Sequence, residues 1–239
     1  MQFSIVGVCL DRKKFRRGSH NAPYELRNAF TDMETFLNDV DLKDHWMKDL
    51  GNIIPQNYED IENQIKARFD SKSFPVILGG DHSITLPVVK ALKPKVFVSF
   101  DAHPDCDESE ISPKSVTRKI FESGFKTVLH GVRTISKKES EFIKKNQITV
   151  SSLEDLRKIN EPVYLSIDFD VLDPSIMPSV AWPEPNGLSF NQVLDGVKAL
   201  AKNLIAIDFV EFVPSENITY ALIAGKLIYS SLVEVIKSR

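Results

Sequence analysis

Cysteine is scarce in this chain, where Cys9 and Cys106 are the only two among 239 residues. Two cysteines provide no disulfide framework for a chain of this length, so reduced thiols and a cytoplasmic location are expected. Cys106 lies beside an acidic segment, but a small buried side chain is a simpler interpretation of it than a reactive thiol.

An excess of positive charge is also missing, because 33 acidic residues stand against 30 basic ones. No basic stretch carries interleaved aromatic residues, so nucleic acid is not expected as a partner. The opening residues 1–8 have neither a basic region nor a small-residue cleavage site, and they predict a first strand rather than a secretory signal. The apolar stretch 218–236 is interrupted by Lys226 and Glu234, which predicts a packed helix and no membrane span.

Repeats, low-complexity tracts and composition shifts are absent from the sequence, so residues 1–239 are expected to form a single catalytic domain. Apolar runs of strand length alternate with stretches of helical periodicity. The expected strands cover 3–9, 74–78, 96–100, 127–130, 163–167 and 204–210, and the expected helices cover 57–69, 84–92, 137–145, 191–201 and 217–236. This alternation predicts an α/β fold with helices on both faces of a mainly parallel sheet.

Residues suited to metal binding are concentrated in three short segments: GGDHS (79–83), SFDAHPD (99–105) and SIDFDVLDP (166–174). Extended backbone sends alternate side chains to one face, so the polar groups within each of the last two segments are expected to point together. The carboxyl ends of parallel strands form the usual ligand site of such a sheet. The candidate ligands are His82, Asp101, His103, Asp105, Asp168 and Asp170.

Four carboxylates and two neutral imidazoles carry a charge that two divalent cations neutralise. Because no thiolate is among the ligands, the set favours Mn²⁺ or a similar ion over structural zinc. Two such ions roughly 3.5–4 Å apart share a water and lower its pKa enough to present hydroxide at neutral pH. Two other acids have simpler interpretations, since Asp81 is placed to cap a helix and Asp173 precedes a proline in a turn.

The order of the motifs resembles that of the ureohydrolases, the family of arginase, agmatinase and formimidoylglutamase. The resemblance covers almost the whole chain and includes GVR (131–133), PEPNGL (183–188) and DFVEFVP (208–214) besides the three metal-binding segments. It implies a three-layer αβα fold of the arginase type with a binuclear manganese site. By the same resemblance, Asp101 and Asp168 bridge the ions, His82 and Asp105 complete one of them, and His103 and Asp170 complete the other.

The resemblance also implies the catalytic residues. Glu211 corresponds to the acid that holds the substrate guanidinium, and Asp208 is expected nearby as a supporting substrate-binding residue. A metal-bridging hydroxide then attacks the guanidinium carbon, and Asp105 relays its proton toward the leaving nitrogen. The expected partner is therefore a small cationic guanidino compound, and relatives imply a homo-oligomer, a trimer or hexamer.

Two stretches depart from the family pattern. Many members carry a histidine in the loop after DAHxD, but this chain has Ser-Pro-Lys-Ser-Val at 112–116, and a usual glycine-rich stretch is replaced by Met-Pro-Ser-Val-Ala-Trp at 177–182. Of the other histidines, His20 is the one whose loop could reach the site. The acids at 107, 108 and 110 favour agmatine, hydrolysed to putrescine and urea, over a carboxylate-bearing substrate. The alternatives are arginase, another guanidino or formimino hydrolase, or a metal-binding protein of this fold with lost or altered catalysis.

Overall fold

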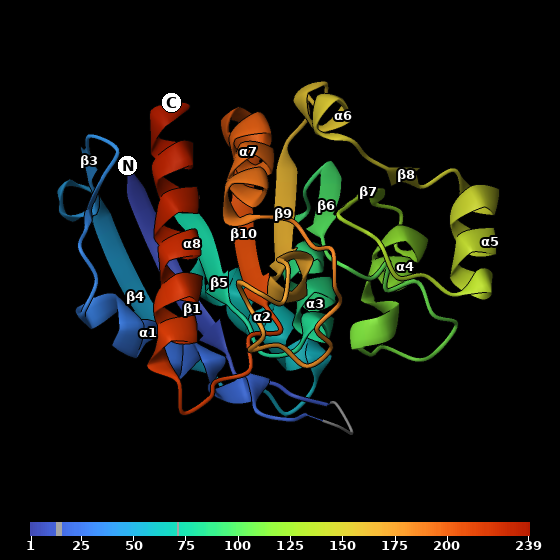
Figure 1. Cartoon of the computed structure of the whole chain (residues 1–239), viewed down its shortest axis with the longest axis horizontal. Helices are drawn as coiled ribbons and strands as arrows, with labels where there is room; N and C mark the ends of the chain where they lie inside the picture. Colours follow the sequence, from blue (N-terminus) through green and yellow to red (C-terminus); the bar gives the residue numbers. More distant parts are fainter. Residues whose placement is uncertain (13–15, 71) are drawn as a thin grey trace.

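Eight parallel strands form a sheet through the middle of the structure, a computed structural model that describes residues 1–12, 16–70 and 72–239 (Figure 1). The strand order is β4-β1-β5-β10-β9-β6-β7-β8. The strands are β1 (Gln2–Val8), β4 (Trp46–Ile53), β5 (Phe74–Leu78), β6 (Val96–Phe100), β7 (Lys126–His130), β8 (Thr149–Val150), β9 (Val163–Asp168) and β10 (Leu204–Val210). A separate antiparallel pair joins β2 (Phe36–Leu37) to β3 (Val40–Asp41).

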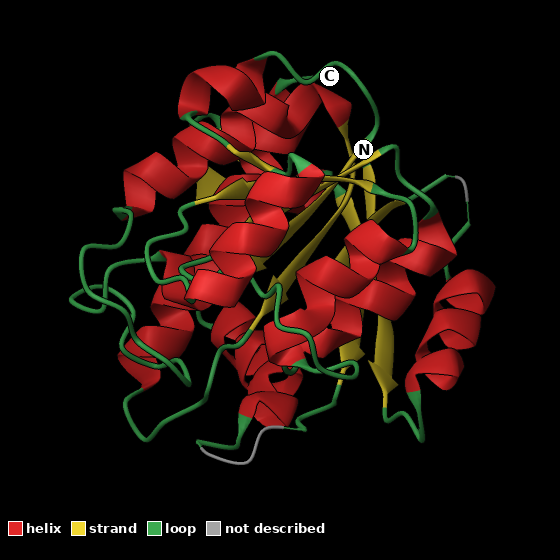
Figure 2. Ribbon diagram, turned by 90° about the vertical axis from the view of Figure 1, so that its right-hand side faces the viewer, coloured by secondary structure: helices red, strands yellow, loops and turns green. Residues whose placement is uncertain are grey.

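Helices cover both faces of this sheet, as the turned view in Figure 2 shows. One face packs against α1 (Ala22–Thr31), α6 (Leu153–Arg157), α7 (Phe190–Leu200) and α8 (Ile218–Lys237). The opposite face packs against α2 (Tyr58–Arg68), α3 (Thr85–Leu92) and α4 (Val116–Glu122), while α5 (Lys137–Asn146) lies by β7. The three-layer αβα fold with a parallel sheet, expected from the sequence, is confirmed.

Alternation along the strands decides which core each side chain joins. Val96 and Val98 belong to the cluster with α8, whereas Phe97 between them packs with α2 and α3. Both faces are apolar because both are covered, which is why the central strands read as continuous hydrophobic runs. Helix α8 is long and apolar enough to cross a membrane, but 56% of its apolar window is buried inside the molecule, as expected for a core helix.

The strands that precede the candidate site residues are neighbours in the middle of the sheet. Strands β5, β10, β9 and β6 lie side by side, although the chain passes from β5 directly to β6 and returns later to fill the two places between them. Such a reversal of strand order leaves a crevice at the carboxyl ends of the strands. Residues far apart in the sequence meet there.

Several elements were not expected from the sequence: β4, β8, α1, α4 and α6. Strand β4 is polar, because it contains Lys48, Asp49 and Asn52. It lies at the edge of the sheet, where Lys48 and Asp49 are exposed rather than covered by helices, so it does not need apolar side chains there. An edge strand of this kind lacks the apolar run that marks a central one.

Candidate metal centre and substrate pocket

Three strand ends bring the six candidate ligands together. His82 begins a 3₁₀ turn (His82–Ile84) shortly after β5, and Asp101 follows β6 directly. Asp168 is the last residue of β9, and Asp170 lies in the 3₁₀ turn that comes next (Phe169–Val171). The remaining two, His103 and Asp105, lie in the loop after β6. Two overlapping groups of potential metal ligands result, joined by Asp101.

The side chains converge through turns rather than through extended backbone. The Oδ1 of Asp101 accepts the backbone N–H of His103 at 2.6 Å, and the Oδ1 of Asp168 accepts that of Asp170 at 2.8 Å. Aspartate favours this local bond two residues on. Asp105 has a left-handed backbone with φ of 49°. The expected alternation is therefore wrong as the cause, although the predicted residues do meet.

The first group is centred on the buried imidazole of His82. Its Nδ1 lies 2.9 Å from Asp105 Oδ2, 3.1 Å from Asp101 Oδ2 and 3.6 Å from Asp168 Oδ2. Among the described residues, neither His82 Nδ1 nor Asp101 Oδ2 has a hydrogen-bond partner of acceptable geometry. These two buried atoms lie 3.1 Å apart without forming a hydrogen bond, an arrangement that suits a shared cation.

The second group is centred on His103, whose Nδ1 lies 2.9 Å from Asp170 Oδ2 and 3.6 Å from Asp101 Oδ1. Its other ring nitrogen, Nε2, lies 3.5 Å from Glu184 Oε1. Glu184 in turn accepts the hydroxyl of Thr134 at Oε2, at 2.9 Å. A carboxylate behind a metal-binding imidazole is a common arrangement, because it fixes the orientation of the ring.

The charges of this cluster show what it requires. Burial, with the charge of Asp170 next in size, raises the pKa of Asp168 well above its usual value. Burial and the charge of Asp101 raise the pKa of Asp105 to about 8. Burial alone would lower the pKa of His82, but the carboxylates of Asp101 and Asp105 hold it well above its usual value. Four acids in this space need positive charge, and the donor set fits two divalent cations, with Asp101 the residue shared by both groups.

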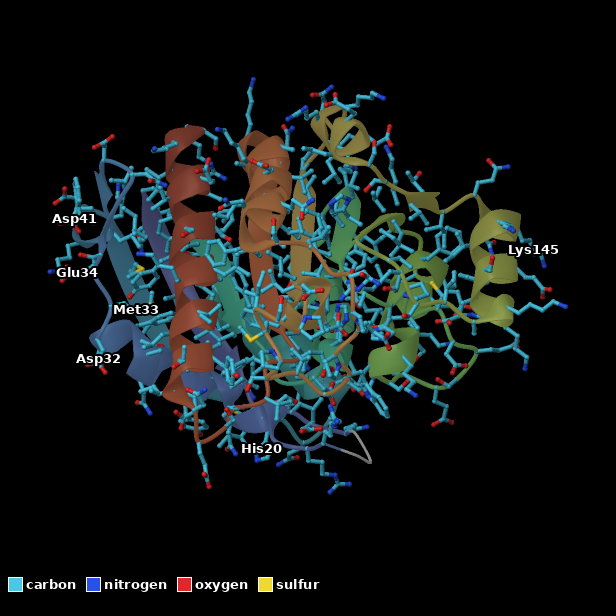
Figure 3. The ribbon with its side chains drawn as sticks, in the orientation of Figure 1. His20, Asp32, Met33, Glu34, Asp41 and Lys145 are labelled. Carbon is cyan, nitrogen blue, oxygen red and sulfur yellow. The ribbon has the colours of Figure 1, made fainter. Side chains whose placement is uncertain are left out.

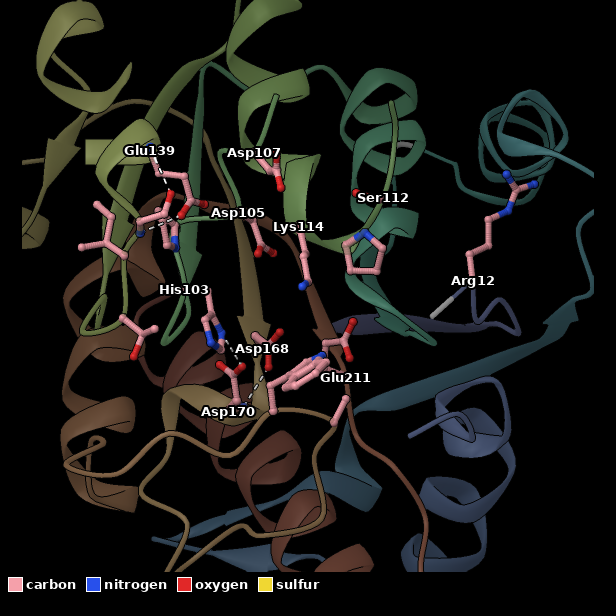
Figure 4. Close-up of a pocket in the computed structure, with 17 residues that line it drawn as sticks. Arg12, His103, Asp105, Asp107, Ser112, Lys114, Glu139, Asp168, Asp170 and Glu211 are labelled. Carbon is pink, nitrogen blue, oxygen red and sulfur yellow. Dashed lines mark hydrogen bonds and ion pairs between the residues drawn. The ribbon is translucent and has the colours of Figure 1, made fainter. Parts of the chain in front are cut away.

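Glu211 follows β10 and is 6% exposed. Its Oε1 accepts the backbone N–H of His82 at 2.8 Å, and its own N–H donates to the carbonyl of Gly80 at 2.9 Å. Its φ of 68° is left-handed, which costs roughly 1–3 kcal/mol for a residue with a β-carbon. These two bonds hold the strained backbone and aim the carboxylate at the space beside the candidate metal ligands, and Figure 4 shows it facing the pocket with Asp168.

Asp208 lies elsewhere. The sequence placed it beside the substrate, but it is 0% exposed within β10 and does not line the pocket. Its Oδ2 accepts the hydroxyls of Tyr164 at 2.6 Å and Thr85 at 2.7 Å. The oxygen of Ser166 lies 3.5 Å from that of Thr85 and 3.0 Å from Nε2 of His82. A direct contact with a substrate does not fit this geometry, because the sheet register buries Asp208 behind His82.

A pocket of about 600 Å³ opens above these ligands. We call its buried part the pocket floor: His103, Asp105, Asp168, Asp170 and Glu211. We call its exposed part the pocket mouth: Arg12, Asp107, Lys114, Ile135 and Trp182. A pocket with a carboxylate-rich floor and a mixed mouth suits a slender polar molecule that enters with one end first.

The whole chain resembles known proteins. Residues 1–233 match the model of the Arginase family. The chain belongs to the arginase family. It is 33% identical to the N(1)-aminopropylagmatine ureohydrolase of Thermococcus kodakarensis over 97% of this chain and 90% of that protein, and 31% identical to the agmatinase of Pyrococcus horikoshii over 84% of this chain and 79% of that protein. The solved agmatine ureohydrolase of Thermoplasma volcanium superposes with a TM-score of 0.86 at 29% identity, covering 99% of this chain and 92% of that one.

This arginase-family chain is therefore a ureohydrolase, a hydrolase of guanidino C–N bonds. The family depends in general on two metal ions, and the candidate ligands described above fit that requirement. The family match favours an enzyme over a scaffold that has lost catalysis. Within the described residues, His103 is the one histidine that lines the pocket. His20 does not line it, and its side chain is 49% exposed at the outer edge of the molecule (Figure 3).

Arg133 is the functional-site residue whose role the sequence did not reveal. Its guanidinium donates to the carbonyls of Asp170 at 2.6 Å and Glu184 at 2.8 Å, and more weakly to those of Val171 and Leu172. One planar side chain thus ties the loop that carries a metal ligand to the loop that forms the pocket wall. The GVR motif was the available signal, but only the fold shows which carbonyls the arginine reaches.

The residues that the sequence predicted to have structural roles, Asp81, Asp173 and Cys106, have those roles in the folded chain. Asp81 accepts the N–H of Ser83 at 3.0 Å and caps the turn there, and Asp173 accepts the N–H groups of Ser175 and Gly187, both at 3.0 Å. Cys106 is 1% exposed in a small apolar cluster, and burial raises the pKa of its thiol. A thiol in this state is not a nucleophile.

Proposed function

We propose that this ureohydrolase acts on agmatine, releasing urea and putrescine, with two Mn²⁺ ions held by His82, Asp101, His103, Asp105, Asp168 and Asp170. The observation that carries the proposal is the position of Glu211, a buried carboxylate on the pocket floor beside the metal ligands. A carboxylate that can form paired, charge-assisted hydrogen bonds is the natural partner of a planar guanidinium. The names of the two relatives described above support a substrate with a guanidinium at one end and an amine beyond it.

The chain's own residues divide the work. Glu211 orients the guanidinium, since its carboxylate is fixed by the N–H of His82. Asp105 faces the pocket and is placed to pass a proton toward the leaving nitrogen. When bound, two divalent ions lower the pKa of water, so that a hydroxide nucleophile is available near neutral pH. Asp208 supports His82 from behind through Thr85 and Ser166.

One observation favours a substrate with a carboxylate tail instead. Of the three acids at 107, 108 and 110, only Asp107 lines the pocket, whereas Glu108 lies 3.7 Å from Arg118. The same loop contributes Lys114 to the mouth, a cation that would pair with a carboxylate. Arginine or a guanidino acid is therefore the second candidate.

The test is a substrate panel with the Mn²⁺-loaded protein. Urea release is measured from agmatine, N(1)-aminopropylagmatine, arginine and 4-guanidinobutyrate, and glutamate formation from formiminoglutamate. We expect the highest kcat/KM with agmatine. Activity confined to arginine or 4-guanidinobutyrate would overturn the substrate, and manganese bound without any hydrolysis would overturn the enzymatic proposal. The cytoplasmic location and the trimeric or hexameric assembly stay predictions.

A further inference from the structure

The two departures from the family pattern touch each other. Lys114 comes from the stretch that replaces the family's histidine loop, and Trp182 comes from the stretch that replaces its glycine-rich segment. In the folded chain Lys114 Nζ lies 5.2 Å from the centroid of the Trp182 ring, a cation–π contact. Both line the pocket mouth.

Within the described residues, neither side chain forms an ion pair or a side-chain hydrogen bond there. Lys114 forms no ion pair with a carboxylate of the described chain, although it reaches into the pocket toward Glu211 (Figure 4). Trp182 is 46% exposed, so much of its indole faces the pocket and solvent. The other mouth cation, Arg12, stacks on the Tyr58 ring with Cζ 4.6 Å from its centroid, and Figure 4 shows it directed away from Glu211.

The chemistry of Lys114 matches the tail of the proposed substrate. A lysine side chain is a butyl chain ending in an ammonium, and agmatine beyond its guanidinium is the same fragment. The ring face of Trp182 therefore already carries, in the free chain, a group equivalent to the end of agmatine. Two ammonium ions on one ring repel each other, so a bound cationic tail and Lys114 cannot share the contact.

We propose that the face of the Trp182 ring binds the alkylammonium end of the substrate. In the free enzyme Lys114 occupies this binding site until the substrate displaces it. This rests on the proposed function, since it names the part of the enzyme that recognises the distal amine. Trp182 is then a specificity-determining residue. Displacing Lys114 from the Trp182 ring costs part of the binding free energy of the substrate. If Lys114 instead binds a substrate carboxylate, its replacement should weaken the binding of 4-guanidinobutyrate and leave that of agmatine unchanged.

The test uses the Mn²⁺-loaded full chain and variants Lys114→Met, Trp182→Leu and the double variant. Agmatine is compared with butylguanidine, which has the same guanidinium and chain but no ammonium, and with 4-guanidinobutyrate. Dissociation constants for putrescine, measured by calorimetry, test ammonium binding at Trp182 without turnover. Ile135→Ala is the matched control, because Ile135 is an exposed apolar residue of the same mouth without a ring face.

Trp182→Leu is expected to raise KM for agmatine and the dissociation constant of putrescine, each about 2- to 5-fold. KM for butylguanidine should change less than 2-fold. Lys114→Met is expected to lower KM for agmatine by about the same factor, and to have no effect once Trp182 is replaced. Ile135→Ala should affect agmatine and butylguanidine equally. The proposal is wrong if Lys114→Met raises KM for 4-guanidinobutyrate and leaves KM for agmatine unchanged. It is also wrong if Trp182→Leu changes KM for agmatine and butylguanidine by the same factor. If no substrate is hydrolysed, the proposed function is wrong. Putrescine binding to the Trp182 and Lys114 variants then still tests whether the Trp182 ring binds an ammonium.

Discussion

The pocket floor and the pocket mouth are built in different ways. On the floor, Asp168 and Glu211 each accept a backbone N–H, as does Asp101 beneath the floor, and all three follow or end central strands. At the mouth, Lys114 lies in a short 3₁₀ turn (Pro113–Ser115) and Trp182 in a loop, and each is exposed. The residues proposed to hold the metal ions and the guanidinium are thus fixed by the sheet, while the residues proposed to select the substrate lie at exposed positions that tolerate change.

The candidate metal centre beneath the floor should be impaired most severely by Asp101→Asn. Asp101 belongs to both groups of candidate ligands, so loss of its charge affects both ions. We expect a fall in kcat of about 1,000-fold or more, together with less than two manganese ions per chain by elemental analysis. Retention of two ions with near-normal turnover would show that Asp101 is not a ligand to both.

The next largest effect is expected from Glu211→Gln. The glutamine keeps an oxygen to accept the N–H of His82 but loses the charge that pairs with a guanidinium. A fall in kcat/KM for agmatine of about 100-fold follows from an unpaired buried cation, with manganese content unchanged. Elemental analysis of the same sample is the control, since loss of metal would assign the defect to the ligands instead.

Asp208→Asn separates support from substrate contact. Asp208 is linked to His82 through Ser166 and Thr85 and lies outside the pocket lining, so its charge should influence the metal and not the substrate. We expect manganese to bind about 10-fold more weakly in a competition titration, with KM for agmatine at saturating manganese within a factor of about 2. A raised KM at full metal occupancy would restore the substrate contact expected from the sequence.

The smallest effects are expected from the exposed acids of the mouth loop. Glu108→Gln and Glu110→Gln should each leave kcat/KM for agmatine within about 2-fold, because neither residue lines the pocket and exposed charges are screened by salt. Asp107→Asn is the matched comparison within the same loop, since Asp107 does line the pocket. A large effect at Glu108 or Glu110 in low salt would show long-range attraction of the substrate.

The sequence was sufficient to predict six of the eight strands of the sheet and the convergence of the metal ligands. Apolar runs mark buried central strands, and the carboxyl ends of parallel strands meet at one edge, so His82, Asp101 and Asp168 could be brought together without coordinates. The polar edge strand β4 was not predicted, because its exposed side chains require no apolar run. The turns that aim Asp105 also escaped, because a left-handed φ is not encoded by alternation.

Residue types and their order were enough to indicate a carboxylate-rich metal centre, because that chemistry needs particular side chains after particular strands, and the resemblance to the ureohydrolases implied the acid for a guanidinium. Only the tertiary structure separated Glu211 from Asp208, since a shift of three residues moves a carboxylate from the end of β10 into its buried interior. Only the tertiary structure brought Lys114 onto Trp182. Loops carry no periodicity, so the contact between two of them depends on where the sheet places their ends.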